Sequence, residues 1–237
     1  MRVWFFSAKQ VLWWFFICLT VGIYLGTASP AVLPVFGTQA FSVAGKTIVI
    51  DAGHGGPDPG AVSARGALEK EITLNVAKEL EYLLKRAAVF TVMVRHGDYD
   101  LADSSERNLL NRKRQDLARR VAIAEEAGAD LYISIHANYF PSPIWSGAQT
   151  FYYEGQEEGM QLARCLQAEL VRYLGPNHRL ARPGEYRVLR DTSMPAALVE
   201  VGFLSNPQEA ALLGKKSYQK RIAAAILAGI IRYYNES

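Results

Sequence analysis

Hydrophobic and polar positions along the chain follow two periods in turn, one typical of strands and one typical of helices. Short apolar, β-branched runs predict strands, and apolar residues at three- and four-residue spacing predict helices. The expected strands cover residues 47–51, 89–94, 130–138, 148–153, 186–189 and 194–203, and the expected helices cover 69–86, 112–127, 157–174, a short segment from 206, and 217–234. Because strands and helices alternate, we expect an α/β fold: a single domain with a mixed, mostly parallel central sheet flanked by helices.

The N-terminal region has a different pattern, an apolar run behind two positive charges. Arg2 and Lys9 precede the uncharged run 11–26, and such charges stay on the cytoplasmic side when the run enters a membrane. The run is short for a spanning helix and long for the core of a signal peptide. The expected organisation is a signal peptide or membrane anchor over 1–30, a linker over 31–45, and one folded domain over 46–237.

Composition limits the class of protein without identifying it. The 237 residues are 50% hydrophobic and 21% charged, which is enough apolar material for a sizeable core. The net charge of +3 comes from scattered basic residues, so we expect no nucleic-acid binding, whereas an anionic polymer such as a cell wall is compatible with it. Cys18 and Cys165 lie in segments of different kinds, so we expect no disulfide framework.

A histidine lies at or just after the carboxyl end of two of the expected strands. His54 follows the first strand within a glycine-rich turn, and His136 lies near the end of the third. Open α/β sheets place their sites at these ends, so two such strands side by side would aim both imidazoles at one point. His96 also follows a strand but lacks the glycine framework, and His178 lies in a loop where we expect it to be solvated.

Two carboxylates also attract attention. Glu69 lies in the first turn of the helix 69–86, where an acidic residue usually only complements the helix dipole. A short loop nevertheless brings this helix start beside His54. Glu200 interrupts an apolar strand, where a carboxylate is costly unless it is paired, bound to an ion or open to a cleft. At this point His54 fits either a metal ligand or part of a phosphate-cradling loop.

Four short motifs, in order along the chain, resemble those of one enzyme family. They are Asp-Ala-Gly-His-Gly-Gly around His54, Leu-Glu-Lys-Glu-Ile around Glu69, Ser-Ile-His-Ala-Asn around His136, and Leu-Val-Glu-Val-Gly-Phe-Leu-Ser-Asn around Glu200. Together they are similar to the zinc-dependent N-acetylmuramoyl-L-alanine amidases of the Amidase_3 family, from about Lys46 to the C-terminus. Within that family, a short catalytic domain behind one hydrophobic segment resembles the germination-specific amidases of the spore cortex.

The resemblance implies one Zn²⁺ per chain, held by His54, Glu69 and His136, with Glu200 as the catalytic acid and base. Zinc hydrolases commonly use three such ligands and leave a fourth position for water, and a nearby carboxylate moves the proton. Each imidazole also needs an acceptor on its other nitrogen, for which we expect Asp51 or a backbone carbonyl. The implied substrate is peptidoglycan, at the amide between N-acetylmuramic acid and L-alanine.

The resemblance and the N-terminal segment together predict where the protein acts. We expect it outside the cytoplasm, secreted or anchored to the outer face of the cytoplasmic or forespore membrane, in the cortex maturation that forms muramic-δ-lactam. The family's division amidases carry an inhibitory insert that has no counterpart between Tyr153 and Met160, and wall-binding repeats are lacking. Control is therefore expected from the timing of expression, from a helper protein or from substrate delivery.

Other functions stay open at this stage. A general amidase of the vegetative wall would carry the same four residues, and a wall-binding protein without catalysis would keep the fold without turnover. A nucleotide-binding α/β domain needs a helix directly after the glycine turn, and here a long loop intervenes. Zinc content together with amidase activity separates an enzyme from a binding protein, and thermal shifts with nucleotides test the last interpretation.

Overall fold

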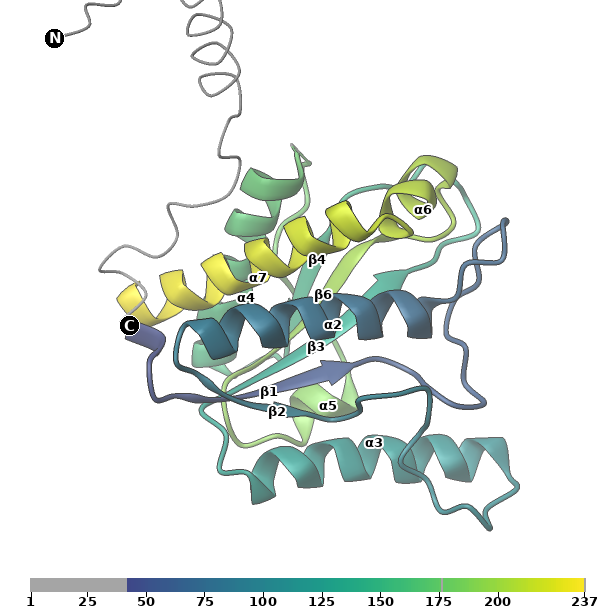
Figure 1. Cartoon of the computed structure of the whole chain (residues 1–237), viewed down its shortest axis with the longest axis horizontal. Coiled ribbons are helices and arrows are strands. Elements are labelled where there is room, and N and C mark those ends of the chain that lie inside the picture. The colour runs from purple at the N-terminus through teal and green to yellow at the C-terminus, as the bar shows by residue number, and fades with distance from the viewer. Residues whose placement is uncertain (1–41, 176, 237) are drawn as a thin grey trace, which may run out of the picture. The chain divides into compact units, whose positions relative to one another are not determined.

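A central sheet organises the computed structural model, which describes residues 42–175 and 177–236. The strands lie in the order β2-β1-β3-β6-β4-β5, with helices on both faces (Figure 1). The elements are β1 (Thr47–Ala52), α2 (Glu69–Arg86), β2 (Phe90–Met93), α3 (Leu109–Glu126), β3 (Leu131–Asn138), β4 (Gln149–Tyr152), α4 (Glu157–Leu174), β5 (Arg182–Pro183), α5 (Arg187–Arg190), β6 (Ala196–Phe203), α6 (Pro207–Leu213) and α7 (Lys216–Glu236). The predicted α/β architecture is confirmed.

The predicted N-terminal organisation lies mostly outside the described residues, including all of 1–30. The described end of the predicted linker belongs to the folded body, because Val43 is fully buried and the Gly45 N–H donates to the Ala88 carbonyl at 2.9 Å. Across 42–175 and 177–236, no helix combines the length and apolarity that a bilayer-spanning segment needs.

The strand directions bring the carboxyl ends of β1, β3 and β6 to one edge of the sheet. These strands and β2 run parallel, whereas β4 is antiparallel to β6 and therefore starts at that edge. His136 pairs with Glu200 between β3 and β6, and Glu200 pairs with Gln149 between β6 and β4. Because directly paired residues project to the same face of a sheet, these side chains form a row across three strands.

Helices cover both faces of this sheet. α2, α4 and α7 pack side by side on one face, and α3 and α5 lie on the other (Figure 1). β6 is buried along its whole length, as expected for a strand covered on both sides. Leu198 lies two residues before Glu200, on the same face, and belongs to one core cluster with Val188 and Leu189 from the α5 segment. The row of His136, Glu200 and Gln149 therefore faces α3 and α5.

The predicted strand 186–189 is wrong. This segment forms the start of α5, in which the N–H groups of Leu189 and Arg190 both donate to the Tyr186 carbonyl. The apolar pattern misled because Val188 and Leu189 are both buried. Consecutive residues of a strand face opposite sides, whereas a helical turn lets both pack on the same sheet. The strand in this part of the chain is β5, which begins at Arg182.

The main helix predictions agree closely with the structure. α2 and α4 have the predicted bounds, 69–86 and 157–174. α3 starts at Leu109, before the predicted residue 112, because the Asn108 side chain accepts hydrogen bonds from two N–H groups in its first turn. Such caps satisfy backbone donors that lack a partner within the helix.

Two buried arginines fix the backbone that follows β1. Arg95 is 0% exposed and Arg120 is 1% exposed. Arg95 donates to the carbonyls of Ala52 and Gly53, at 2.8 and 2.9 Å. Arg120 donates to the carbonyls of Ala52 and His54, at 2.9 and 2.8 Å. Three consecutive carbonyl oxygens therefore point at guanidinium groups, which sets the course of the turn that carries His54.

The charge of Arg120 is balanced inside the protein. Its guanidinium lies 2.5 Å from Asp51 and 2.8 Å from Asp116. Asp51 also accepts hydrogen bonds from the hydroxyls of Tyr132 and Ser134, at 2.7 and 2.8 Å. Burial alone would raise the pKa of Asp51, but Arg120 and these partners lower it. Removing the cation would therefore leave two buried carboxylates without their charge partner.

Replacing Arg120 by Leu is expected to destabilise the fold strongly. Breaking a buried ion pair from one side costs about 3–5 kcal/mol, and the turn carbonyls lose their donor as well. The free energy of unfolding from urea titration measures this loss. Arg114→Leu, at an exposed position of the same helix, is the matched control and should change the free energy by less than about 0.5 kcal/mol. Equal effects of the two variants would contradict the assigned role.

Candidate active site

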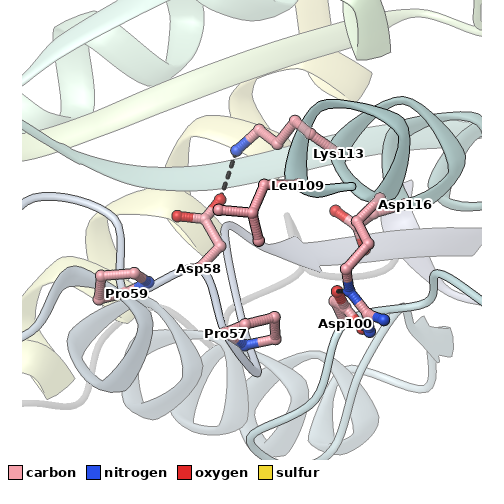
Figure 2. Close-up of a pocket in the computed structure, with 8 residues that line it drawn as sticks. Pro57, Asp58, Pro59, Asp100, Leu109, Lys113 and Asp116 are labelled. Atoms are coloured by element: carbon pink, nitrogen blue, oxygen red, sulfur yellow. Dashed lines mark hydrogen bonds and ion pairs between the residues drawn. The ribbon is translucent and has the colours of Figure 1, made fainter. Parts of the chain in front are cut away.

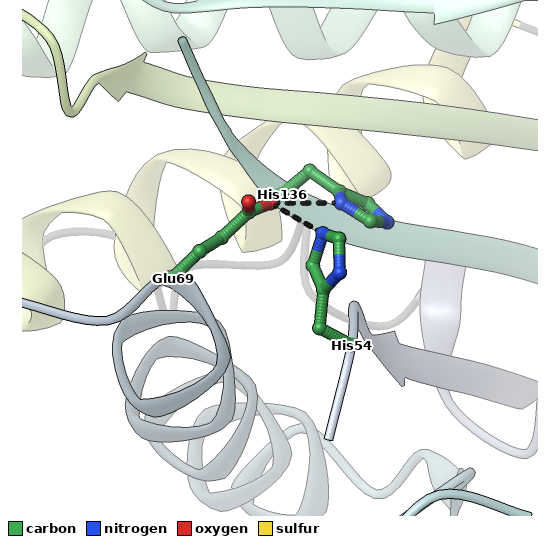
Figure 3. A group of neighbouring side chains, drawn as sticks. All are labelled: His54, Glu69 and His136. Atoms are coloured by element: carbon green, nitrogen blue, oxygen red, sulfur yellow. Dashed lines mark hydrogen bonds and ion pairs between the residues drawn. The ribbon is translucent and has the colours of Figure 1, made fainter. Parts of the chain in front are cut away.

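Three side chains from separate elements converge at the edge where β1 and β3 end (Figure 3). His54 follows β1, His136 lies in β3, and Glu69 is the first residue of α2. The Glu69 Oε1 atom lies 3.0 Å from His54 Nε2 and 2.9 Å from His136 Nδ1. One ligand atom from each residue lies within 4.8 Å of the others, and no second group of this kind occurs among the described residues.

The backbone of the turn makes this approach sterically feasible. His54 has a φ of 63°, a left-handed conformation that is uncommon outside glycine. A Cβ atom on Gly53 would lie 2.3 Å from the His136 ring, and one on Gly60 would lie 2.5 Å from the Glu69 carboxylate. Gly53 and Gly60 are therefore required by the closeness of the three side chains.

Hydrogen bonds hold the Glu69 carboxylate in place from behind. Its Oε2 accepts from the Ala61 N–H at 2.7 Å, and its Oε1 accepts from the Ala137 N–H at 3.0 Å. Burial alone would raise the pKa of Glu69, but hydrogen bonds with His136 and His54 hold it well below its usual value. The carboxylate is therefore ionised at neutral pH and aimed at both imidazoles.

Asp58 is the acceptor on the other nitrogen of His54. The Asp58 Oδ2 atom lies 2.9 Å from His54 Nδ1 and 2.5 Å from the Lys113 ammonium of α3, a contact drawn in Figure 2. Burial alone would lower the pKa of His54, but its hydrogen bonds with Asp58 and Glu69 raise it to about 9. The ring is thus held from both sides, with Nε2 facing the other two side chains.

Asp58 was not predicted from the sequence as the acceptor for His54. Asp51, one of the two kinds of acceptor predicted, makes no hydrogen bond with either imidazole, because its oxygens accept from the buried network around Arg120. Asp58 lies four residues after His54 within the same glycine- and proline-rich loop, which is a usable signal. Nothing in the sequence pattern indicates that Lys113 pairs with Asp58, because this contact depends on how α3 packs against the loop.

Glu200 lies next to the three converging side chains. It is paired with His136 across β3 and β6 and is 9% exposed. Its Oε2 atom is buried and has no hydrogen-bond partner among the described residues. Burial, together with the negative charge of Glu69, raises the pKa of Glu200 to about 8. Buried carboxyl atoms rarely lack a partner, so this group points to a chemical role.

The other two histidines do not join the group. His96 is exposed after β2, which is the edge strand beyond β1. His178 is exposed in the loop after α4, as predicted. Of the two histidines that follow a strand end near β1, the one within the glycine-rich turn, His54, is the one that meets Glu69 and His136.

A cavity of about 340 Å³ lies beside the two converging histidines. Its walls come from the turn after β1, from α3 and from the α5 segment, and include His54, Lys113, His136 and Tyr186. Two imidazole nitrogens and one carboxylate oxygen form a ligand set that suits Zn²⁺ in hydrolases. The donor chemistry of this site therefore fits a metal ion, and the cavity offers room for substrate.

Comparison with known proteins identifies the family. The N-acetylmuramoyl-L-alanine amidase family model matches residues 48–232. The germination-specific N-acetylmuramoyl-L-alanine amidase of Bacillus subtilis is 45% identical over 196 residues, covering 82% of each chain.

Solved structures give the same result. The CwlD amidase of Clostridioides difficile, solved in complex with the GerS lipoprotein, matches with a TM-score of 0.79 and 35% identity, over 81% of this chain and 100% of that one. The catalytic domain of the amidase CwlV from Bacillus (Paenibacillus) polymyxa matches with a TM-score of 0.68 and 33% identity, over 81% and 99%. The chain therefore belongs to the N-acetylmuramoyl-L-alanine amidase family and is a peptidoglycan amidase.

Proposed function

We propose that this amidase is zinc-dependent and cleaves the amide bond between N-acetylmuramic acid and L-alanine, with Glu200 moving the proton. One observation carries the proposal. His54, Glu69 and His136 meet in a metal-ligand arrangement beside a buried carboxylate whose Oε2 has no partner among the described residues. Such an arrangement supports metal-assisted hydrolysis.

The converging side chains have defined parts in this proposal. His54 Nε2, a Glu69 oxygen and His136 Nδ1 are the atoms that would hold the ion, because they face one another. When bound there, Zn²⁺ supplies the Lewis acidity that polarises the scissile carbonyl and lowers the pKa of water to about 7. Asp58 orients the ring of His54, and partners of this kind typically tune ligand geometry and basicity.

Glu200 is the group proposed to carry the proton. Its pKa of about 8 is close enough to neutral pH for both of its forms to be accessible. It can therefore take a proton from the attacking water and return it to the leaving nitrogen. Neighbouring strands lie about 4.8 Å apart, so its pairing with His136 keeps it close to the scissile bond.

We further propose that the enzyme acts on the spore cortex, where removal of stem peptides precedes muramic-δ-lactam formation. The identity with the germination-specific amidase of Bacillus subtilis supports this role. The structure of a relative in complex with a lipoprotein supports a helper protein for this chain as well. The substrate lies outside the cytoplasm, which agrees with a signal peptide or membrane anchor over residues 1–30. A general amidase of the vegetative wall is the competing assignment.

The metal assignment predicts that His54→Ala loses its zinc. The purified wild-type protein should hold about one Zn²⁺ per chain, and chelation should abolish its activity. Elemental analysis should find almost no zinc in His54→Ala, because two side-chain ligands hold the ion poorly. His96→Ala is the matched control and should keep both metal and activity. Loss of zinc from His96→Ala, with retention in His54→Ala, would overturn the ligand set.

The assignment of Glu200 predicts a separation between metal binding and turnover. Glu200→Gln keeps the size of the side chain but cannot take up the proton, so kcat should fall by about 10²–10⁴-fold. Its zinc content should equal that of the wild type. Glu154→Gln, at an exposed turn position, should leave both quantities unchanged. Zinc loss in Glu200→Gln would make this residue a ligand, and unchanged turnover would remove it from the proton path.

The cellular role is tested by muropeptide analysis of spores that lack the gene. We expect cortex without muramic-δ-lactam and with stem peptides retained on the residues that normally form the lactam. Vegetative cells should separate normally. Cortex with normal lactam content, together with vegetative cells that fail to separate, would contradict the spore role and favour the general wall amidase.

A further inference from the structure

A second cavity lies beyond Glu200, on the side away from His136. It has a volume of about 580 Å³ and is lined by residues of two segments, 144–149 and 177–182. Gln149 lines it and is also the partner of Glu200 across β4 and β6. Since the row of His136, Glu200 and Gln149 shares one face of the sheet, this cavity continues the active-site face toward β5. We name it the arginine cavity, after Arg179 and Arg182 in its wall.

Arg179 is held rigidly by neutral groups. Its Nε donates to the Ser146 carbonyl at 2.6 Å, and its Nη1 donates to the Gln149 side-chain oxygen at 3.0 Å. Its guanidinium also lies 4.4 Å from the centre of the Phe203 ring. No carboxylate forms an ion pair with it among the described residues, and the nearby Glu209 accepts hydrogen bonds from backbone N–H groups instead. The charge of Glu209 therefore acts on Arg179 without a direct ion pair, and the guanidinium has no carboxylate as a hydrogen-bond partner in the described structure.

Arg182 adds a second positive charge that is free to bind a ligand. It pairs with Phe151 between β5 and β4, two positions along β4 from Gln149, so its side chain projects to the face that carries Glu200. It is exposed and forms no hydrogen bond or ion pair with any described residue. Burial lowers the pKa of Arg179 and the positive charge of Arg182 lowers it further, whereas the negative charge of Glu209 raises it.

The chemistry of the substrate supplies the missing anion. The proposed function places the scissile amide beside the three converging side chains and Glu200, and a substrate that continues past Glu200 along this face reaches Gln149 and the arginine cavity. The stem peptide bears a free carboxylate on the residue after L-alanine. Guanidinium groups bind carboxylates through paired, charge-assisted hydrogen bonds. A carboxylate of the stem peptide is therefore a suitable ligand for the arginines of this cavity.

We propose that the arginine cavity binds a carboxylate of the stem peptide through Arg182, with Arg179 as a fixed second positive charge. This inference rests on the proposed function, since it takes the stem peptide as the substrate. Arg182 is thus a specificity residue that contacts substrate away from the reacting atoms. Its contribution is expected in KM, because the contact is made equally in the ground state and in the transition state.

The test compares two synthetic muramoyl peptides with the zinc-loaded enzyme. One carries D-glutamate after L-alanine, and the other carries the corresponding amide, isoglutamine, which has no charge at that position. The wild type should favour the acid by about tenfold in kcat/KM, as for one charge-assisted hydrogen bond. Arg182→Gln should raise KM for the acid by about tenfold, keep kcat within about twofold, and leave the amide substrate unaffected.

Control variants separate this role from a structural one. Arg182→Lys keeps the charge without the paired donors and should recover part of the preference. Arg164→Gln removes an exposed arginine from α4, on the opposite face of the sheet, and should behave as the wild type. An Arg182→Gln enzyme that still prefers the acid to the same extent would overturn the inference while leaving the amidase assignment intact. Failure of the zinc-loaded wild type to cleave either peptide would instead refute the proposed function.

Discussion

Two buried guanidinium groups hold the carbonyl oxygens of residues 52–54, and the candidate site depends on that constraint. Arg95 follows the end of β2 and Arg120 lies in α3. Their hydrogen bonds therefore attach the turn after β1 both to the end of β2 and to α3. The cost of burying these cations is offset by Asp51 and by the full set of hydrogen bonds around them. The left-handed backbone at His54 is thereby fixed before any ligand arrives.

The sheet places several of the candidate functional side chains on one face. His54 and His136 come from adjacent parallel strands, and Glu200 comes from the next strand over. Antiparallel β4 extends the same row toward the arginine cavity. In this arrangement His136, the proposed proton carrier Glu200 and Arg182 come from successive parts of the sheet, and Glu69 joins the histidines from the start of α2. A substrate that is itself extended can contact all of them at once.

The sequence predicted the parts of the fold and site that depend on local pattern. β-branched runs ending in polar residues located β1, β3 and β6, and with them His54, His136 and Glu200. The role of the Glu69 helix start needed the resemblance to the family, because its acidic first turn is ordinary by itself. The segment 186–189 was assigned as a strand because local pattern does not show whether two adjacent apolar residues face one side or two.

Long-range packing accounts for what the sequence did not predict. The pairing of Asp58 with Lys113 spans 55 positions, and that of Asp51 with Arg120 spans 69. Neither spacing leaves a periodic trace, and the charged residues of α3 resemble an ordinary solvated helix face. The arginine cavity likewise forms only when the segments before β4 and before β5 come together in the sheet.

The central claim is that His54, Glu69 and His136 hold one zinc ion, and X-ray absorption at the zinc edge of the zinc-loaded chain tests it most directly. The account predicts only nitrogen and oxygen ligands at about 2.0–2.1 Å, with outer-shell scattering from two imidazoles. Substituting His136 by Ala should remove the signal of one imidazole from whatever zinc remains bound. A sulfur shell at about 2.3 Å, or an unchanged two-imidazole signal in that variant, would contradict the assignment.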